Sequence, residues 1–317
     1  MLNGAMLVWF TLTAASFSFV VWDSITNGVT SWVQRAAWIL VTLYTGPIGL
    51  VFYLLACRRP FPGAHDAYTK APWKQGLNSE MHCVAGDATG ILIAAAVVPA
   101  FHLANGLDIL IEYTAGFVCG LFIFQALMMR GMYGGDYFKA VRKTFFAETV
   151  SMNMVMTGMI PTMVLLAHAW PGSEDPINPE FWFRMSIATI VGAVIAFPIN
   201  HWLVSHHLKH GCMTLPGADQ VAPHLGHRSP EPAMATHGPA HGEMSMREGG
   251  MSMGDMEHGS EHAGMAMGDM KHHAGHGGMA MEMPSLPLPR ALAWIGGTYA
   301  ILIAAIVLTA LFVPINF

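Results

Sequence analysis

The chain has 317 residues, of which 53% are hydrophobic and only 11% are charged, and its formal net charge is −5 at pH 7. Soluble chains carry about 25% charged residues, so this composition and a mean hydropathy of +0.44 exclude a soluble enzyme. The 15 Lys and Arg residues against 20 Asp and Glu residues exclude a nucleic-acid-binding protein. Four cysteines without C-x-x-C spacing exclude a disulfide-stapled secreted domain. The sequence therefore predicts an all-α, polytopic membrane protein.

Seven apolar runs are each long enough to cross a bilayer, which takes about 20 helical residues. We expect a bundle of about seven spans, at about 2–22, 36–57, 84–102, 109–130, 148–170, 181–208 and 290–313. The chain starts without a basic segment or a clear cleavage site, so the first run is interpreted as a retained helix. If that run were peripheral, six spans would remain. Residues 1–208 are thus expected to form a six-span region, and residues 290–317 a seventh helix.

The short loops predict the orientation, because Lys and Arg accumulate on the cytoplasmic side of a membrane. The loops after the second and fourth spans are basic, with Arg58, Arg59, Lys70 and Lys74 in one and Arg130, Lys139, Arg142 and Lys143 in the other. The loop between the fifth and sixth spans is acidic. We therefore expect the N-terminus, these basic loops and the loop between the sixth and seventh spans in the cytoplasm, and the C-terminus outside.

A His/Met-rich segment lies between the last two spans, at about 209–289, and holds 13 of the 25 Met and 10 of the 17 His residues. It has few large aliphatic residues to bury, which predicts a disordered loop in the absence of ligand. The unit Met251–His258 recurs fourteen residues later as Met265–His272, and H-x-x-M-x-M occurs three times, beginning at His241, His262 and His276. We call residues 209–289 the His/Met tract.

The His/Met tract is a candidate metal-binding loop, because soft thioethers and borderline imidazoles together suit Cu(I), with Ag(I) as a surrogate. Nickel or zinc binding, and a linker without chemistry, are the alternatives. The candidate ligands in the repeats are His241, Met244, Met246, Met251, Met253, Met256, His258, His262, Met265, Met267, Met270, His272, His276, Met279 and Met281.

Ionisable and sulfur-bearing residues also lie in or beside the spans, where they mark functional sites by default. The third and fourth spans and their flanks contribute the candidate metal ligands Met81, His82, Cys83, Asp87 and Glu112. On the fifth span, Glu148, Met152, Met156, Met159 and Met163 are separated by 4, 4, 3 and 4 residues and share one helix face. This row predicts a metal path through the bilayer.

Each of these assignments has a plainer alternative. The methionine row is also compatible with a packing surface. Asp87 and Glu148 are each compatible with an interfacial position, as helix caps or as partners of Lys143 or Arg142. Pro161 lies inside the row and is expected to break the helix ladder locally.

Two further features complete the pattern. His102 and His168, near the outer ends of two spans, are candidates for a metal entry or exit site, for a haem axial pair, or for plain solvation. The pair Gly116-x-x-x-Gly120 predicts close packing of the fourth span against another helix.

A family resemblance rests on Met81-His82-Cys83, Gly86-Asp87 and Gly90, on Glu112-Tyr113, Gly116-Phe117, Gly120 and Ile123-Phe124-Gln125, and on Ala147-Glu148 and Gly158-Met159. With these residues the chain resembles an uncharacterised bacterial polytopic inner-membrane family over roughly residues 75–205. The resemblance implies a helical fold in the bacterial plasma membrane and brings no established reaction.

The leading functional hypothesis is a Cu(I) transporter that moves copper ions along the Met/carboxylate path and collects them with the His/Met tract. No P-loop or aspartyl-phosphate motif is present, which favours passive or gradient-driven transport and not an enzyme. Two alternatives are a membrane copper chaperone or assembly factor for a respiratory oxidase, and a haem-binding oxidoreductase. The expected partners are membrane lipid, copper ions and a copper chaperone or cuproenzyme, but no nucleic acid.

Overall fold

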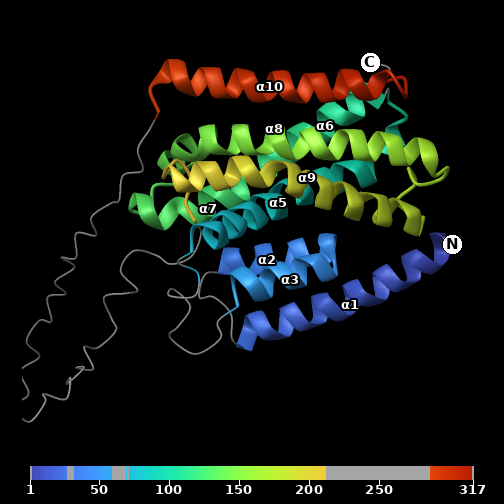
Figure 1. Ribbon diagram of the computed structural model, residues 1–317, viewed down its shortest axis with the longest axis horizontal. Helices are drawn as coiled ribbons and strands as arrows, with labels where there is room; N and C mark the ends of the chain where they lie inside the picture. The colour runs from blue at the N-terminus through green and yellow to red at the C-terminus, as the bar shows by residue number, and fades with distance from the viewer. Residues whose placement is uncertain are drawn as a thin grey trace, which may run out of the picture. The chain divides into compact units, whose positions relative to one another are not determined.

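The computed structural model describes residues 2–26, 32–58, 69, 71–103, 105–211 and 286–315, and over these ranges the chain is helical without strands (Figure 1). This confirms the polytopic helical bundle. The long helices are α1 (Leu2–Thr26), α5 (Pro72–Val97), α6 (Asn105–Val118), α8 (Tyr137–Ala169), α9 (Pro179–Ser205) and α10 (Leu288–Ala310). The shorter elements are α2 (Trp32–Thr45), α3 (Pro47–Ala56), η1 (Val98–Phe101), η2 (Cys119–Gln125), α7 (Ala126–Met129) and η3 (Arg130–Tyr133).

Six stretches of the described chain are long and apolar enough to cross a membrane: Leu2–Thr26, Pro72–Phe101, Gly106–Tyr133, Tyr137–Ala169, Pro179–Ser205 and Leu288–Ala310. They correspond to six of the seven expected spans. The repeats of the His/Met tract, with all of their candidate ligands, lie outside the described residues.

The second expected span, 36–57, is wrong as a single crossing, because α2 and α3 form a hairpin. The chain breaks at Gly46, whose φ of 57° favours glycine, and continues at Pro47, which has no N–H to donate. Beyond the break α3 runs back along α2: the rings of Trp38 and Tyr53 contact edge to face at 5.5 Å. A Cβ on Gly49 would likewise lie 2.8 Å from the Cα of Thr42.

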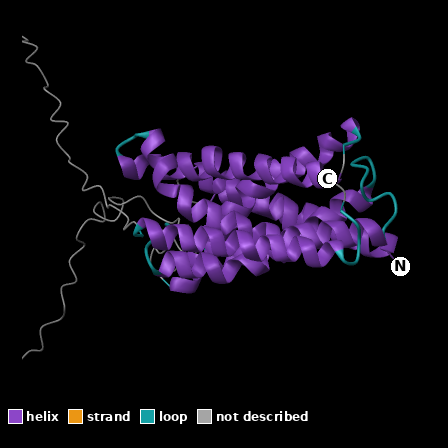
Figure 2. Cartoon of the chain, turned by 90° about the horizontal axis from the view of Figure 1, so that it is seen from above, coloured by secondary structure: helices purple, strands orange, loops and turns teal. Residues whose placement is uncertain are grey.

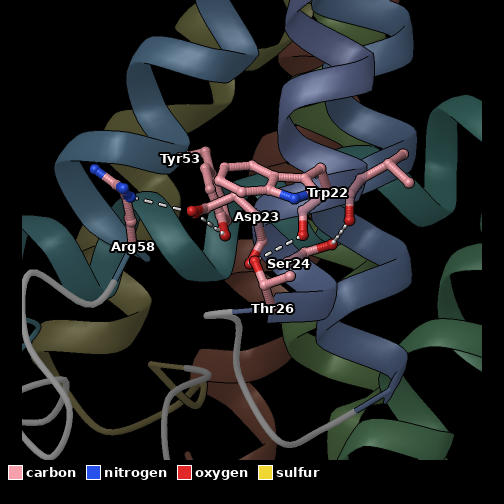
Figure 3. A network of polar contacts seen from close by, with 7 residues as sticks. Trp22, Asp23, Ser24, Thr26, Tyr53 and Arg58 are labelled. Carbon is pink, nitrogen blue, oxygen red and sulfur yellow. Dashed lines mark hydrogen bonds and ion pairs between the residues drawn. The ribbon is translucent and has the colours of Figure 1, made fainter.

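The turn of the hairpin lies beside the middle of α1, and the end of α3 bonds to Asp23 near the end of α1. A side chain at Gly46 would collide with the hydroxyl of Thr13, halfway along α1. Where α3 ends, the Tyr53 hydroxyl donates to the fully buried Asp23 carboxylate at 3.0 Å, and Arg58 pairs with the same carboxylate at 3.3 Å (Figure 3). The hairpin therefore enters and leaves the bundle at the end where α1 finishes.

This hairpin bears on the topology, because six candidate spans, an even number, would place both ends of the described chain on one face. Near its start, α1 contacts Phe183 at the beginning of α9, with Trp9 at a ring distance of 6.0 Å. Val313, just after α10, lies in a pocket with His168, at that same end. Both chain termini accordingly lie at one end of the helices (Figure 1, Figure 2). This arrangement differs from the predicted placement of the two termini on opposite faces of the membrane.

Glycines set the close approach of the central helices. A Cβ on Gly86 of α5 would lie 2.9 Å from the Cα of Gly120, and a Cβ on Gly116 would lie 2.7 Å from the Met152 methyl group. On the other side of α8, a Cβ on Gly158 would lie 2.8 Å from the Cα of Gly192 on α9. The close packing predicted from Gly116 and Gly120 is confirmed, and its partners are α5 and α8.

Candidate functional site

A buried polar cluster lies between α5, η2 and α8. Glu80, Cys83 and Asp87 are spaced three and four residues apart on α5, so they share one face of that helix. From η2, Gln125 Nε2 donates to Cys83 Sγ at 2.7 Å and to Glu148 Oε2 of α8 at 3.0 Å. The three carboxyl groups and the thiol are fully buried. Asp87 and Glu148 therefore lie inside the bundle and not on its surface.

Asp87 and Glu148 approach each other across Gly120. A Cβ at Gly120 would collide with Oδ1 of Asp87 and with Oε1 of Glu148, so both carboxyl groups occupy the space that a side chain would take. Gly120 belongs to η2, a π-helical segment, and such segments are frequent at functional sites. The glycine and the widened helix together make room for the pair.

The second half of the cluster comes from α8, α9 and the residues that follow α9. Asn200 Nδ2 donates to Oε2 of Glu80 and, at 2.8 Å, to the hydroxyl of Ser151. Lys209 Nζ donates to Oδ1 of Asn200. The buried Asn200 amide thus joins the Lys209 ammonium to the Glu80 carboxylate. We call Glu80, Cys83, Asp87, Gln125, Glu148, Ser151, Asn200 and Lys209 the inner cluster.

Lys209 supplies the positive charge of the inner cluster. Burial by itself lowers its pKa, but Cys83, Glu148 and Glu80 together raise the pKa above the ordinary value for lysine. A single ammonium faces three carboxyl groups here. Removing a charge from water costs on the order of several kcal/mol unless the charge is paired or neutralised. The excess carboxyl charge therefore has to be met by protons or by a cation.

His82 is buried beside this region with its ring edge-to-face to Phe124 at 5.7 Å. Neither ring nitrogen has a hydrogen-bond partner among the described residues. Met81, the remaining candidate on this stretch of α5, packs in the apolar core instead of the inner cluster.

The methionine row leads away from the inner cluster along α8. Met152, Met156 and Met159 are fully buried, and Met163 is nearly so. Met152 packs on Gly116 of α6, and Met159 packs on Gly192 of α9. Pro161 lies inside α8, and the helix continues through it from Tyr137 to Ala169. The break of the hydrogen-bond ladder predicted at Pro161 therefore does not divide the helix.

The row ends at a pocket of about 920 Å³ at the opposite end of α8, which we call the outer pocket. Met163 and Glu112 line it together with His102, His168 and Arg184. The two histidines that the sequence singled out therefore share one pocket. Asp108, Glu174 and Asp175 also line it, so that its rim is acidic.

A row of buried methionines on α8 thus lies between two polar regions. In the part of the chain that the structure describes, no group of three or more His, Cys, Asp or Glu side chains is arranged to hold a metal ion. Methionine is not one of these four residue types, so the methionine row remains a separate candidate metal site.

Four inner-cluster residues were missed from the sequence: Glu80, Ser151, Asn200 and Lys209. Glu80 carried a signal, because it precedes Cys83 and Asp87 at helical spacing. Asn200 carried another as an uncharged amide within an apolar span. Lys209 carried none, since its position after α9 is that of an ordinary interfacial lysine.

These features define the class: a polytopic helical membrane protein with a buried polar cluster at one end of its bundle and a polar pocket at the other. Residues 72–209 match the family model described as Domain of unknown function (DUF4396). The match covers α5 to the end of α9 and thus the inner cluster and the methionine row, and it confirms the resemblance noted over residues 75–205. No curated protein and no solved structure gives a significant match.

Proposed function

We propose that this protein transports Cu(I) across the bacterial plasma membrane, with Ag(I) as a surrogate substrate. The observation that carries the proposal is the buried row Glu148, Met152, Met156, Met159 and Met163, which connects the inner cluster to the outer pocket. Thioethers are soft, neutral ligands that suit Cu(I) and offer little to hard cations.

The dimensions of the row support this role. From Glu148 to Met163 the helix rises about 22 Å, at roughly 1.5 Å per residue. The hydrocarbon core of a bilayer is about 30 Å thick. The row thus covers most of the distance over which a bare cation has no water, and the polar residues at its two ends cover the remainder.

The two ends supply different ligands for entry and release. The outer pocket offers imidazoles from His102 and His168 and the carboxyl group of Glu112. The inner cluster offers the Cys83 thiol with the Asp87 and Glu148 carboxyl groups. A cation moving along the row would exchange oxygen and nitrogen ligands for sulfur and then return to oxygen and sulfur.

The His/Met tract, which follows α9 in the chain, is proposed to collect copper ions for the inner cluster. A tethered set of ligands raises the local ion concentration without offering a path through hydrocarbon. By the loop charges, the tract and the inner cluster face the cytoplasm, and both chain termini face outside.

The test is Ag(I) uptake into proteoliposomes that contain the full chain. Replacing Met152, Met156 and Met159 together with Leu preserves volume and apolarity, so the fold should survive. This triple variant should abolish uptake. A matched control replaces Met6, Met154 and Met185, which lie outside the row, with Leu and should retain uptake. Uptake by the row variant at the wild-type rate would refute the path.

A copper chaperone or assembly factor is the second candidate, and the tight packing of the row favours it. Met152 and Met159 fill the spaces left by glycines, as packing residues do. In this reading the protein delivers copper to a respiratory oxidase without net transport. Failure of the proteoliposome assay together with stoichiometric Cu(I) binding would favour it.

The haem alternative rests on the position of His102 and His168 in one pocket. Haem held by such a pair absorbs strongly in the visible range. A Soret band in the purified protein that disappears in His102→Ala would establish this alternative in place of transport.

A further inference from the structure

The outer pocket is larger than a site for a bare cation needs to be. Its volume of about 920 Å³ falls in the range of pockets that enclose small organic molecules, roughly 300–1,000 Å³. Apolar side chains, among them Ala95, Ile109 and Val164, line it together with the charged groups. A cation would fill only a small part of this space, whereas an organic ligand with an apolar portion fits both the size and the lining.

One wall of the outer pocket is the loop between α8 and α9, and bonds within the protein hold this loop in place. The side-chain amide of Asn178 donates to the Gly172 carbonyl at 2.9 Å, and the Trp182 indole N–H donates to the Pro176 carbonyl at 2.9 Å. The wall therefore forms without a ligand. Pockets that are largely pre-formed in this way are typical of small-molecule sites.

Two side chains of opposite charge line the outer pocket without bonding each other. Arg184 comes from α9 and Glu112 from α6, and each is only 7% exposed. Nε of Arg184 and Oε2 of Glu112 have no hydrogen-bond partner among the described residues. No ion pair joins the two, since the ion pair found within the described ranges is that of Arg58 with Asp23.

The neighbouring charges do not complete this arrangement. The charges that act on Arg184 are those of Glu112 and Glu174, and the charges that act on Glu112 are those of Arg184 and Asp108. Burying such groups without bonded partners costs free energy, and a ligand that bonds them removes that cost. The planar guanidinium of Arg184 suits a carboxylate, which it can bond through two parallel N–H groups. Glu112 suits a group that donates hydrogen bonds, such as an ammonium.

We propose that the outer pocket binds a small zwitterion of the α-amino acid class, whose carboxylate pairs with Arg184 and whose ammonium group pairs with Glu112. The further carboxyl groups of Asp108 and Glu174 favour the ammonium end and disfavour a ligand with two negative charges. The apolar part of the ligand lies against the apolar lining. A simple carboxylate or a simple amine would use only one of the two buried groups.

This binding goes beyond the proposed transport and does not depend on it. The imidazoles of His102 and His168, which the transport proposal uses as metal ligands, take no part in holding the zwitterion. Binding is therefore measured on the protein without added metal, and its outcome is independent of the Ag(I) uptake assay.

The experiment measures binding of L-leucine to the purified full chain in detergent by isothermal titration calorimetry. The comparison ligands are 4-methylpentanoate, which lacks the amine, and 3-methylbutylamine, which lacks the carboxylate. L-leucine should bind at least about ten times more tightly than either, because only L-leucine pairs with both buried groups.

Arg184→Gln and Glu112→Gln should each weaken L-leucine binding by about tenfold or more, since each leaves one charged end of the ligand unpaired. Two matched controls should bind like wild type. Arg142→Gln makes the same change at an exposed arginine of α8. Glu180→Gln makes it at a carboxyl group in the first turn of α9 that does not line the pocket.

Three results would overturn the proposal: no binding of L-leucine at millimolar concentration, equal affinity for L-leucine and 4-methylpentanoate, or unchanged affinity in Arg184→Gln. If one variant does not fold by size-exclusion chromatography, the other variant carries the test. The comparison of the three ligands on the wild-type chain needs neither variant.

Discussion

The Tyr53 hydroxyl donates a 3.0 Å hydrogen bond to the buried Asp23 carboxylate, and this contact ties the returning end of the α2–α3 hairpin to α1. Arg58 pairs with the same carboxylate oxygen at 3.3 Å (Figure 3). These bonds hold residues 36–57, which the sequence predicts to be one span, as a hairpin that begins and ends at the same end of the bundle.

Tyr53→Phe removes this hydrogen bond and keeps the ring contact with Trp38. We expect a loss of about 1 kcal/mol in the free energy of unfolding, since one buried acceptor loses a donor but retains Arg58. The measurement is reversible denaturation in detergent. Tyr299→Phe, which removes a partly exposed hydroxyl, serves as the control and should cost less. An equal loss in both variants would remove the special role of the Asp23 contact.

The shared face of the two chain termini is tested by single-cysteine reporters in a cysteine-free background. Cysteines placed at Asn3 and Pro314, both exposed, should react with an impermeant reagent from the same side. A cysteine at the exposed Asp136, between η3 and α8, should react only from the opposite side. By the loop charges, the first two label in intact cells. Labelling of Asn3 and Pro314 from opposite sides would restore a seven-span topology.

The α8–α9 crossing depends on Gly158. Its Cβ position lies 2.8 Å from the Cα of Gly192, so Gly158→Val forces two backbones apart. We expect a destabilisation of about 1–3 kcal/mol, as for overpacking in a core, together with a changed position of Met159. Gly296→Ala on α10, where nothing lies within 4 Å, should be neutral. Thermal unfolding in detergent distinguishes the two.

Lys209→Met removes the ammonium from the inner cluster, so the buried carboxyl groups lose their positive partner. Breaking a buried ion pair on one side costs roughly 3–5 kcal/mol. Because the pKa of Lys209 lies above its ordinary value, its contribution is fully present below the ordinary lysine pKa and is lost only as the pH rises beyond the folded value. The difference from wild type should therefore stay constant through neutral and mildly alkaline pH. Adding Glu80→Gln should restore part of the lost stability, and Lys139→Met at an exposed site is the control.

Deleting residues 213–283 removes the repeats of the His/Met tract and keeps the residues that the structure describes. We expect metal-dependent phenotypes to weaken at low copper and to stay largely intact at high copper, because the tract concentrates ions but is not the path. Metal analysis should show several Cu(I) or Ag(I) ions lost with the deletion, and zinc should compete poorly. A stoichiometric loss below one ion, or tighter zinc binding, would contradict this.

Much of the bundle could be predicted from the sequence, because long apolar runs and helical spacing act locally. The face of Glu148, Met152 and Met156 follows from spacing alone, and so does the close packing at Gly116 and Gly120. The hairpin could not be predicted in this way. An apolar run of this length is interpreted as one span. The dipeptide Gly46-Pro47 in its middle is nevertheless a turn signal.

The inner cluster was only partly predictable for a different reason. Asp87 and Glu148 stand out as carboxyl groups in apolar surroundings, but their approach to each other depends on how α5, η2 and α8 cross. Lys209 reaches the cluster after α9 has ended, through a bond to Asn200 nine residues earlier. Contacts of this kind are decided by tertiary packing and not by the composition of any one segment.

The π-helical segment Cys119–Gln125 makes the inner cluster sensitive to the length of the chain and not only to its side chains. Each residue in an α-helix turns the chain by about 100°, and a π-helical turn absorbs one extra residue without shifting its flanks. Inserting one further residue between Gly120 and Gln125 would exceed what the π-helical turn absorbs and would rotate the Gln125 amide by about 100°, away from Cys83 and Glu148. A one-codon insertion here should therefore impair the site more severely than replacing Gln125 with alanine, although it removes no functional group.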